Sequence, residues 1–257
     1  MPLSFSLADK VVLLTGGTGL FGRGLTTALA EAGANLIIAS RNAEKLRAVA
    51  EAETARGHRV FAESYDQSDE SSIAALRQRV EDRFGTPHGL VNNSVLRPMK
   101  GAKGSAAQFE ASMRVNATGL MLMHRIFGES MAAAGCGSIV NIGSIQGMIG
   151  PSYELYEGTA MGDMPPDYFF HKGGVLNLTR FYAAHYGPKG VRVNCVSPGG
   201  FFNNQPESFV KRYCEHTMLG RMADDTDLGG SVVFLLSDAS SYITGANLPV
   251  DGGYTAK

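Results

Sequence analysis

The chain lacks the features that would direct it to a nucleic acid, a membrane or the secretory route. Its 23 Lys and Arg residues balance 24 Asp and Glu residues at a formal net charge of −1, so there is no basic field to hold nucleic acid or anionic lipid. No stretch approaches the roughly 20 apolar residues of a membrane span, and the first residues lack the apolar run of a signal peptide. We therefore expect a cytoplasmic protein that acts on a small molecule, without a nucleic-acid or membrane partner.

Cysteine is scarce, with three residues in 257. Cys136, Cys195 and Cys214 are odd in number, widely spaced and outside any CxxC motif, which indicates buried thiols in a reducing compartment. The six His residues are scattered without the spacing of metal ligands, so no metal site is expected.

Short apolar runs alternate with longer amphipathic stretches over the whole chain. The apolar runs predict strands at 11–15, 35–39, 59–63, 89–92, 138–142, 192–196 and 247–250. The amphipathic stretches predict helices at 21–32, 43–56, 69–84, 105–134, 167–186 and 224–236. Runs such as Val-Val-Leu-Leu are typical of strands buried on both faces of a parallel sheet. This order predicts an α/β fold with a doubly wound parallel sheet between two helical layers, in one domain over 1–257 because no linker-like segment interrupts it.

Two segments, 145–166 and 200–220, are the expected substrate loops. The first follows a predicted strand end, where the ligands of such sheets bind, although a purely structural surface loop is the alternative. Their polar side chains suit a polyol, three basic residues suit a phosphate, and their Met and Phe side chains suit an acyl chain. These groups are Glu154, Glu157, Asp163, Asn203, Asn204 and Gln205; Lys211, Arg212 and Arg221; and Met148, Met161, Phe201 and Phe202.

A glycine-rich turn follows the first predicted strand. Gly16, Gly19 and Gly22 let the backbone turn tightly and approach a pyrophosphate, and the helix beginning near Leu20 offers its free N–H groups to the phosphates. The turn therefore predicts a dinucleotide site. A tight strand-to-helix turn that binds nothing is the alternative.

The end of the second strand indicates which dinucleotide binds. An acidic residue there would hold the ribose 2′-hydroxyl of NAD(H), but the sequence has neutral Ser40 followed by Arg41, whose guanidinium suits a 2′-phosphate. NADP(H) is therefore expected over NAD(H), unless Arg41 is simply a solvated residue at a helix start. Asp66, after the third strand, is expected either to accept a bond from the adenine amine or to cap the next helix.

Tyr168 and Lys172 lie one helical turn apart on the same face of a predicted helix. A neighbouring cation favours the phenolate of a Tyr, which makes Tyr168 a candidate proton donor and acceptor at a hydroxyl or carbonyl carbon. Tyr153 and Tyr156 lack a Lys four residues later and are rejected. His171 lies about 100° around the helix from this pair, which favours a packing or interface role.

Together these motifs resemble, in order and over essentially the full length, the short-chain dehydrogenases/reductases of the classical single-domain type. The elements that carry the resemblance are the turn at 15–22, Asp66, Asn92-Asn93-Ser94, Asn116, Ser144, Tyr168 and Lys172, Pro198-Gly199, and the segment 243–253. The resemblance implies a Rossmann-type fold, an NAD(P) cofactor, hydride transfer at a carbon bearing oxygen, and a homotetramer or homodimer formed through the helices at 105–134 and 167–186.

The resemblance also implies residue roles. Tyr168 would be the general acid/base, and Lys172 would lower its pKa and hold the nicotinamide ribose. Ser144 would orient the substrate oxygen, and Asn116 would hold a helix kink and a water near Lys172. The implied cofactor contacts are Gly16, Thr18, Gly19, Leu20, Phe21, Gly22, Ser40, Arg41, Asp66, Gln67, Asn92, Asn93, Ser94, Tyr168, Lys172, Pro198, Gly199, Phe201 and Asn203.

The sequence departs from the family pattern in four places. Leu20 replaces the usual middle glycine, Ser94 and Val95 replace Ala-Gly, and Asn203 stands where a Thr commonly contacts the cofactor. An insertion also lengthens the gap between Ser144 and Tyr168.

The stretches 153–159 and 197–209 resemble the bacterial flagellin-modification (PtmA-like) oxidoreductases, which implies a sugar derivative as substrate. A 3-oxoacyl-thioester reductase is the alternative enzyme, and a cofactor-binding regulator without turnover is the alternative from another class.

Overall fold

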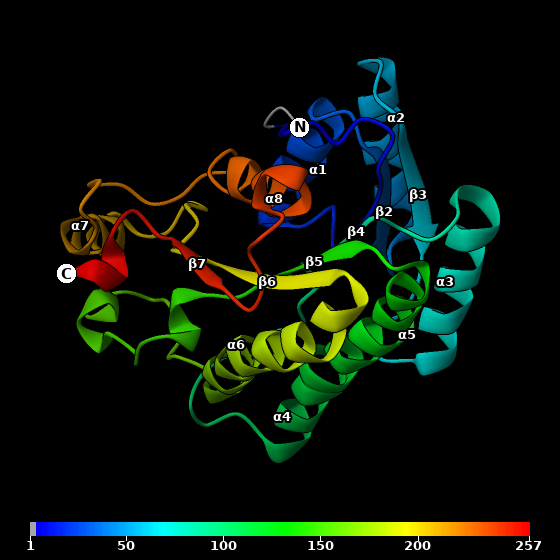
Figure 1. The fold of residues 1–257 in the computed structure, drawn as a ribbon. Coiled ribbons are helices and arrows are strands. Elements are labelled where there is room, and N and C mark those ends of the chain that lie inside the picture. The colour runs from blue at the N-terminus through cyan, green and yellow to red at the C-terminus, as the bar shows by residue number, and fades with distance from the viewer. Residues whose placement is uncertain (1–3) are drawn as a thin grey trace.

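Seven strands form one parallel sheet in the order β3-β2-β1-β4-β5-β6-β7 in the computed structural model, which describes residues 4–257 (Figure 1). The strands are β1 Val11–Thr15, β2 Asn35–Ser40, β3 Val60–Ser64, β4 Gly89–Asn92, β5 Gly137–Ile142, β6 Val191–Pro198 and β7 Asn247–Val250. Every neighbouring pair is parallel. The predicted doubly wound parallel sheet is confirmed.

Helices cover both faces of this sheet (Figure 1). The α-helices are α1 Leu20–Glu31, α2 Ala43–Ala55, α3 Glu70–Phe84, α4 Ala106–Met113, α5 Leu120–Ala134, α6 Pro166–Tyr186, α7 Glu207–His216 and α8 Gly229–Leu236. Successive side chains of a strand point to opposite faces, so Val12 and Leu14 of β1 pack into the core beneath α1, α2 and α8. Val11 and Leu13 pack into the second core beneath α3, α5 and α6.

The middle of the sheet contains the topological switch point. β1 pairs with β2 on one side and with β4 on the other, so the connections leave β1 and β4 in opposite directions. Loops that follow these two strands separate there and leave a crevice at the carboxyl edge of the sheet.

The predicted helix at 105–134 is interrupted by a π-helical turn, η1, Arg114–Gly119. Gln67 enters this turn, where its Nε2 donates to the Val115 carbonyl at 3.0 Å. Gly119 permits the approach, because a Cβ there would lie 2.2 Å from the Gln67 carbonyl oxygen. The kink expected at Asn116 is therefore produced by a contact from the loop after β3.

Two further predictions at the carboxyl end were wrong in detail. The helix expected to begin at 224 begins only at Gly229, because the Asp227 carboxylate pairs with Arg221 at 2.6 Å and accepts from the Asp224 backbone N–H at 2.8 Å, which holds this stretch as a turn. Segment 200–220, expected as a loop, contains α7.

The long segment 145–166 packs against α7. Leu155 is buried in a cluster with Phe209, Tyr213 and Tyr254. Arg212 Nη1 also donates to the Glu157 carbonyl at 2.6 Å, and to the carbonyls of residues 154 and 155. The expected phosphate-binding role of Arg212 and Arg221 was therefore wrong, because both guanidinium groups are engaged within the protein.

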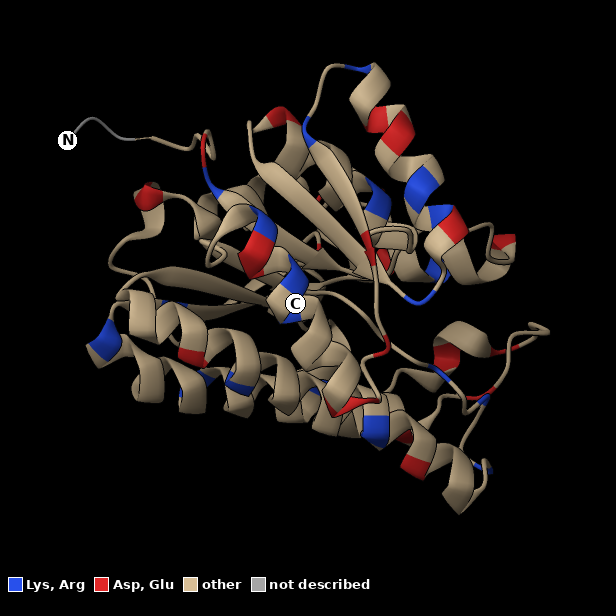
Figure 2. Cartoon of the chain, turned by 90° about the vertical axis from the view of Figure 1, so that its right-hand side faces the viewer, with Lys and Arg blue, Asp and Glu red and all other residues tan. Residues whose placement is uncertain are grey.

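Charges of both signs are interspersed over the helices (Figure 2). Among residues 4–257, no helix is both long enough and apolar enough to cross a membrane.

The three cysteine thiols form no disulfide in this part of the chain. Cys195 is buried as expected, but Cys214 is only half-buried, and Cys136 is exposed because it lies in the turn that precedes β5.

A buried polar network centred on Asn141 of β5 joins the sheet to α5 and α6. Asn141 Oδ1 accepts from Asn92 Nδ2 at 2.9 Å and from His124 Nε2 at 3.0 Å, and its Nδ2 donates to Thr179 Oγ1 at 2.9 Å. The His124 ring also stacks on Tyr182, with 4.4 Å between ring centroids. Burial lowers the pKa of His124, and the hydrogen bond with Asn141 raises it by less, so that the pKa is about 4. The ring is therefore neutral at pH 7.

This network predicts a specific acid sensitivity. The folded protein holds His124 neutral, whereas the unfolded chain binds a proton near pH 6.5, so His124 destabilises the fold progressively as pH falls from about 6.5 to about 4. Each unit of depressed pKa corresponds to about 1.4 kcal/mol. Denaturant unfolding across this range should show a flatter loss of stability in His124→Gln than in wild type. Parallel curves for the two proteins would contradict the assignment.

Candidate active site

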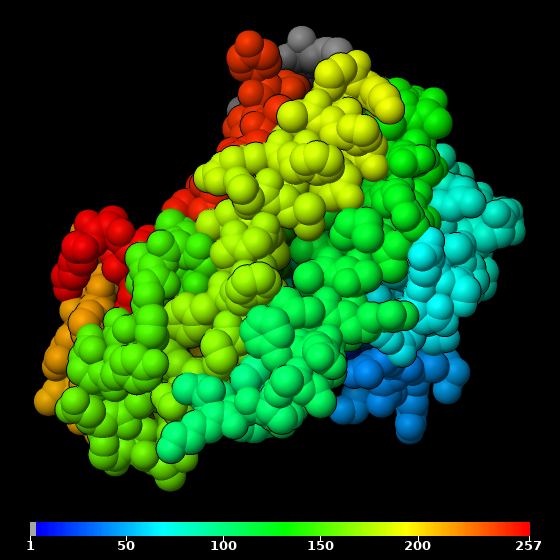
Figure 3. Space-filling view, turned by 90° about the horizontal axis from the view of Figure 1, so that it is seen from below, coloured from blue at the N-terminus to red at the C-terminus, as the bar shows by residue number. Residues whose placement is uncertain are grey.

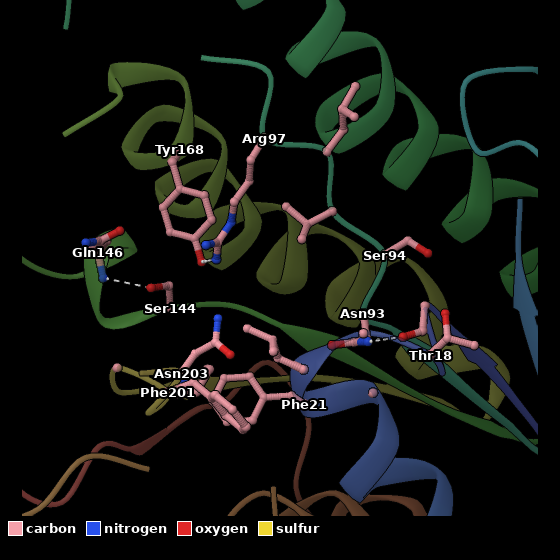
Figure 4. Close-up of a pocket in the computed structure, with 18 of the residues that line it drawn as sticks. Thr18, Phe21, Asn93, Ser94, Arg97, Ser144, Gln146, Tyr168, Phe201 and Asn203 are labelled. Carbon is pink, nitrogen blue, oxygen red and sulfur yellow. Dashed lines mark hydrogen bonds between the residues drawn. The ribbon is translucent and has the colours of Figure 1, made fainter. Parts of the chain in front are cut away.

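A cavity of about 640 Å³ opens at the carboxyl edge of the sheet, at the switch point described above (Figure 4). Its walls come from the segments that follow β1, β2, β3, β4, β5 and β6, together with α6 and α7. Most of the predicted cofactor residues line it: Gly16, Thr18, Gly19, Leu20, Phe21, Gly22, Ser40, Arg41, Asp66, Gln67, Asn93, Ser94, Tyr168, Pro198, Gly199, Phe201 and Asn203. The remaining two, Asn92 and Lys172, lie behind its wall and line a smaller cavity.

The glycine turn at the cavity edge has the geometry of a phosphate cradle. Gly16 has φ of +68°, and a Cβ on Gly22 would lie 2.0 Å from the Gly16 carbonyl oxygen. Gly19, the N-cap of α1, has no side chain that could cap the helix. The first backbone N–H groups of α1 are therefore left at the cavity edge without a capping partner. Leu20 begins α1 normally despite replacing a glycine, so this departure leaves the helix start unchanged.

At one end of the cavity, Ser40 ends β2 and Arg41 follows it, beside Asp66. Ser40 Oγ is buried and has no hydrogen-bond partner among the described residues. The Asp66 pKa is lowered mainly by hydrogen bonds from Ser68, with a smaller contribution from Arg41. Asp69 accepts from the Ser71 N–H and is the N-cap of α3, so Asp66 is not the helix cap.

The segment after β4 is fixed to the glycine turn. Asn93 Nδ2 donates to the Gly16 carbonyl at 3.0 Å, and the backbone N–H groups of Asn93 and Ser94 donate to Thr15 Oγ1 at 3.0 and 3.1 Å. Ser94 therefore lines the cavity in a defined position even though it replaces a smaller residue.

The segment after β6 forms the facing wall. Phe201 packs edge to face on Phe21, with 4.8 Å between ring centroids. Gln205 holds this segment closed, since its Nε2 donates to the Phe201 carbonyl at 2.7 Å and its Oε1 accepts from the Asn203 N–H at 2.7 Å. The Asn203 side chain lies across the cavity from Tyr168 and Ser144 in Figure 4.

Ser144 and Tyr168 meet at the other end of the cavity despite the insertion between them (Figure 4). Ser144 Oγ accepts from the Gln146 N–H at 3.1 Å, which leaves its O–H as a donor. Arg97, from the segment after β4, donates through Nη2 to the Tyr168 hydroxyl at 3.0 Å and covers its ring at 4.4 Å. Nothing in the sequence signalled Arg97, because its partner lies 71 positions away.

The electrostatic surroundings favour the phenolate of Tyr168. Burial alone would raise its pKa, but the charges of Lys172 and Arg97, with hydrogen bonding by Ser144 and Arg97, lower it overall. Tyr156 also lines the cavity, yet burial raises its pKa. This contrast favours Tyr168 as the proton-transfer group.

Lys172 is buried against the end of β5, where its Nζ donates to the Ile142 carbonyl at 2.5 Å. Burial lowers the pKa of Lys172, and Tyr168 and Cys195 oppose that shift. Its ammonium lies 5.7 Å from the centroid of the Tyr168 ring.

Behind the main cavity, a small cavity of about 20 Å³ is lined by Asn92, Asn116, His171 and Lys172, a size that admits one water molecule. Asn116 Oδ1 accepts from the Leu96 N–H at 2.8 Å and its Nδ2 donates to the Leu96 carbonyl at 2.7 Å, so its side chain anchors the segment that carries Arg97.

His171 was expected to have a packing or interface role, and the packing role is confirmed. Its ring is buried against Tyr168, with 5.1 Å between centroids, and its Nε2 has no partner among the described residues. Burial and the charges of Lys172 and Arg97 lower the pKa of His171 to about 3, which keeps it neutral.

The substrate loops contribute a mixed surface. Gln146, Tyr156 and Met161 come from the first, and Asn203, Gln205, Phe209 and Tyr213 come from the second. Glu154, Glu157, Asp163 and Asn204, expected as hydrogen-bonding groups, do not line the cavity, because these segments turn outward at those residues. Among residues 4–257, no group of three or more His, Cys, Asp or Glu side chains is placed to hold a metal.

The two cations give a testable titration behaviour. Because Lys172 and Arg97 both lower the pKa of Tyr168, Lys172→Met and Arg97→Gln should each move its titration to higher pH. The near-ultraviolet phenolate absorbance, taken as the difference from Tyr168→Phe, measures this. An unchanged or lowered pKa in both variants would contradict the electrostatic assignment.

Known proteins resemble this chain over nearly its full length. A family model described as enoyl-(acyl carrier protein) reductase matches residues 19–255. The cis-4-hydroxycyclohexanecarboxylate dehydrogenase of Sinomonas cyclohexanicum is 34% identical, over 98% of each chain. The galactitol 2-dehydrogenase (L-tagatose-forming) of Cereibacter sphaeroides is 33% identical, over 98% of this chain and 97% of the relative.

A solved structure supports the same relationship. The gluconate 5-dehydrogenase of Burkholderia cenocepacia, in complex with NADP and tartrate, superposes with a TM-score of 0.88 at 30% identity, over 98% of each chain. With the sheet order, the glycine turn and the Ser144–Tyr168–Lys172 arrangement already described, these similarities establish the relationship. The chain belongs to the classical short-chain dehydrogenases/reductases, NAD(P)-dependent oxidoreductases that act on CH–OH groups.

Proposed function

We propose that this oxidoreductase uses NADP(H) to interconvert a secondary alcohol and a ketone on a sugar or polyol derivative. Residues 1–257 would form one NAD(P)-binding domain with substrate segments at 145–166 and 200–220. The observation that carries the proposal is the Tyr168 hydroxyl, placed beside Ser144 in a cavity that continues to the glycine turn. Its pKa is lowered by two neighbouring cations.

The roles follow from these contacts. In alcohol oxidation, the Tyr168 phenolate accepts the hydroxyl proton while the Ser144 O–H donates to the same substrate oxygen. Lys172, anchored on the Ile142 carbonyl, stabilises the phenolate. Asn116 lies in the π turn, lines the small cavity beside Lys172 and anchors the backbone of Leu96. The nicotinamide, when bound, accepts or supplies the hydride.

The site fits a dinucleotide. Gly16 adopts the left-handed conformation of the tight turn, and Gly22 lets α1 start close against that turn. The uncapped start of α1 would then offer its N–H groups to a pyrophosphate. Preference for NADP(H) is supported by the buried, unpartnered Ser40 hydroxyl beside the exposed Arg41. The similar gluconate 5-dehydrogenase is in complex with NADP.

Arg41→Ala should weaken NADP(H) binding selectively. A charge-assisted bond from Arg41 to the 2′-phosphate of NADP(H) would contribute roughly 1.5–3 kcal/mol of binding free energy. NAD(H) has no 2′-phosphate, so its binding should not change. Titration calorimetry with both cofactors measures the difference. Equal losses for the two would remove the preference for NADP(H).

A polyol or sugar substrate is supported by the side-chain amide groups of Gln146 and Asn203, which line the cavity. The relatives named for galactitol and gluconate act on such compounds. Met161, Phe209 and Met222 also line this end and are the observation that favours the second candidate, a 3-oxoacyl-thioester reductase.

Turnover should separate these candidates and test Tyr168. We expect cofactor reduction with alditols or aldonates, and faster ketone reduction in that series than with 3-oxoacyl thioesters. Tyr168→Phe should keep cofactor affinity and lose most turnover, because only the proton-transfer group is removed. Preferred reduction of thioesters would replace the sugar proposal, and near-normal turnover in Tyr168→Phe would remove the residue assignment.

We also propose assembly as a homotetramer or homodimer through the face formed by α4, α5 and α6, which lie side by side in Figure 3. Phe170 and Phe181 of α6 are 66% and 60% exposed. Large apolar side chains exposed on one helix favour contact with another subunit.

A further inference from the structure

Arg97 places a positive charge beside the reacting group without a carboxylate to balance it. Its guanidinium donates to the Tyr168 hydroxyl at 3.0 Å and lies over the ring (Figure 4). Within residues 4–257, no Asp or Glu oxygen lies within 4.0 Å of it. The side chain is exposed at the cavity wall, so the N–H groups that do not bond Tyr168 remain accessible to a ligand.

The charged side chains that line the cavity lie at its two ends. Among its described lining residues, Arg41 and Asp66 lie together at the end next to β2 and β3, and Arg97 is the remaining charged group, at the end next to Tyr168. A substrate that reaches Tyr168 therefore meets a guanidinium that no described Asp or Glu side chain pairs with. Such a cation attracts an anionic substituent and offers a carboxylate two parallel hydrogen bonds.

The surroundings favour a carboxylate over a phosphate. A phosphate dianion would call for further cations, but Arg212 is held by backbone carbonyls and Arg221 by Asp227. Lys100 and Lys103, on the same segment as Arg97, do not line the cavity. One planar guanidinium matches one planar monoanion.

We propose that the substrate is a hydroxy acid or the corresponding oxo acid, with its carboxylate bound by Arg97 at the end of the cavity where the hydroxyl or carbonyl carbon reacts at Tyr168. The inference rests on the proposed alcohol/ketone chemistry and names its substrate class. A polyol substrate would then be an aldonate, with a carboxylate where a neutral alditol has a hydroxymethyl group.

Two matched pairs of probes test this with the NADP(H)-loaded enzyme. The polyol pair is threonate and threitol, and the ring pair is 4-hydroxycyclohexanecarboxylate and 4-(hydroxymethyl)cyclohexanol. The ratio of kcat/KM for the anionic member to that for the neutral member is measured in wild type, Arg97→Gln, Arg97→Lys and Lys103→Gln. Lys103→Gln removes one positive charge from the same exposed segment without touching the cavity.

We expect wild type to prefer the anionic member and Arg97→Gln to lower that ratio roughly ten- to hundredfold, as expected for one charge-assisted bond. Arg97→Lys should keep part of the ratio and Lys103→Gln all of it. Because Arg97 also contacts Tyr168, its loss can slow both members of a pair, and only a change in the ratio reports the carboxylate contact.

Equal kcat/KM within both pairs, or a ratio unchanged in Arg97→Gln, would overturn the carboxylate site while leaving the alcohol/ketone chemistry intact. Preference for the anionic ring compound with no turnover of either polyol would support the site and remove the polyol proposal. If neither pair is turned over, thermal stabilisation of the loaded enzyme decides. Stabilisation by the carboxylates that is lost in Arg97→Gln supports the site, and its absence in wild type overturns it.

Discussion

The burial of one ammonium group at the end of β5 sets the geometry on which the active site depends. Lys172 Nζ donates to the Ile142 carbonyl, which fixes α6 against the carboxyl edge of the sheet. A buried cation is stable only with such partners, so the position of α6 is narrowly defined. Tyr168, one turn earlier, is thereby held over the cavity, and the charge that orients the helix also lowers the pKa of the phenol.

The segment after β4 provides the opposite constraint. Asn93 and Ser94 bind the first glycine turn, and Asn116 bonds both backbone groups of Leu96. These contacts attach residues 93–96 to the glycine turn at one end and to the π turn at the other. Arg97 follows directly and contacts Tyr168, so the same segment positions groups at the cofactor end and at the reacting end of the cavity.

The insertion between Ser144 and Tyr168 is accommodated by packing instead of distorting the site. Leu155 is buried among aromatic residues of α7 and of the carboxyl-terminal segment of the chain. Arg212 donates hydrogen bonds to backbone carbonyls of the inserted segment. Gly147 lets the start of the segment lie against α6, since a Cβ there would be 2.4 Å from the Lys172 carbonyl oxygen. The two reacting side chains therefore keep their relative position despite the added residues.

The sequence by itself determined the strands, most helices, the glycine turn and the Tyr168–Lys172 pair, because alternation, helical periodicity and glycine spacing are local properties. The tertiary structure alone decided the contact of Gln67 that produces the π turn, the helix α7, the inward position of His171 and the contact of Arg97 with Tyr168. Each of these depends on partners far apart in the chain, such as Gln67 with Val115 or Arg97 with Tyr168. Local patterns indicate which face of an element is buried, but only the folded chain brings two separate loops to the same edge of the sheet and so places charge beside the reacting group.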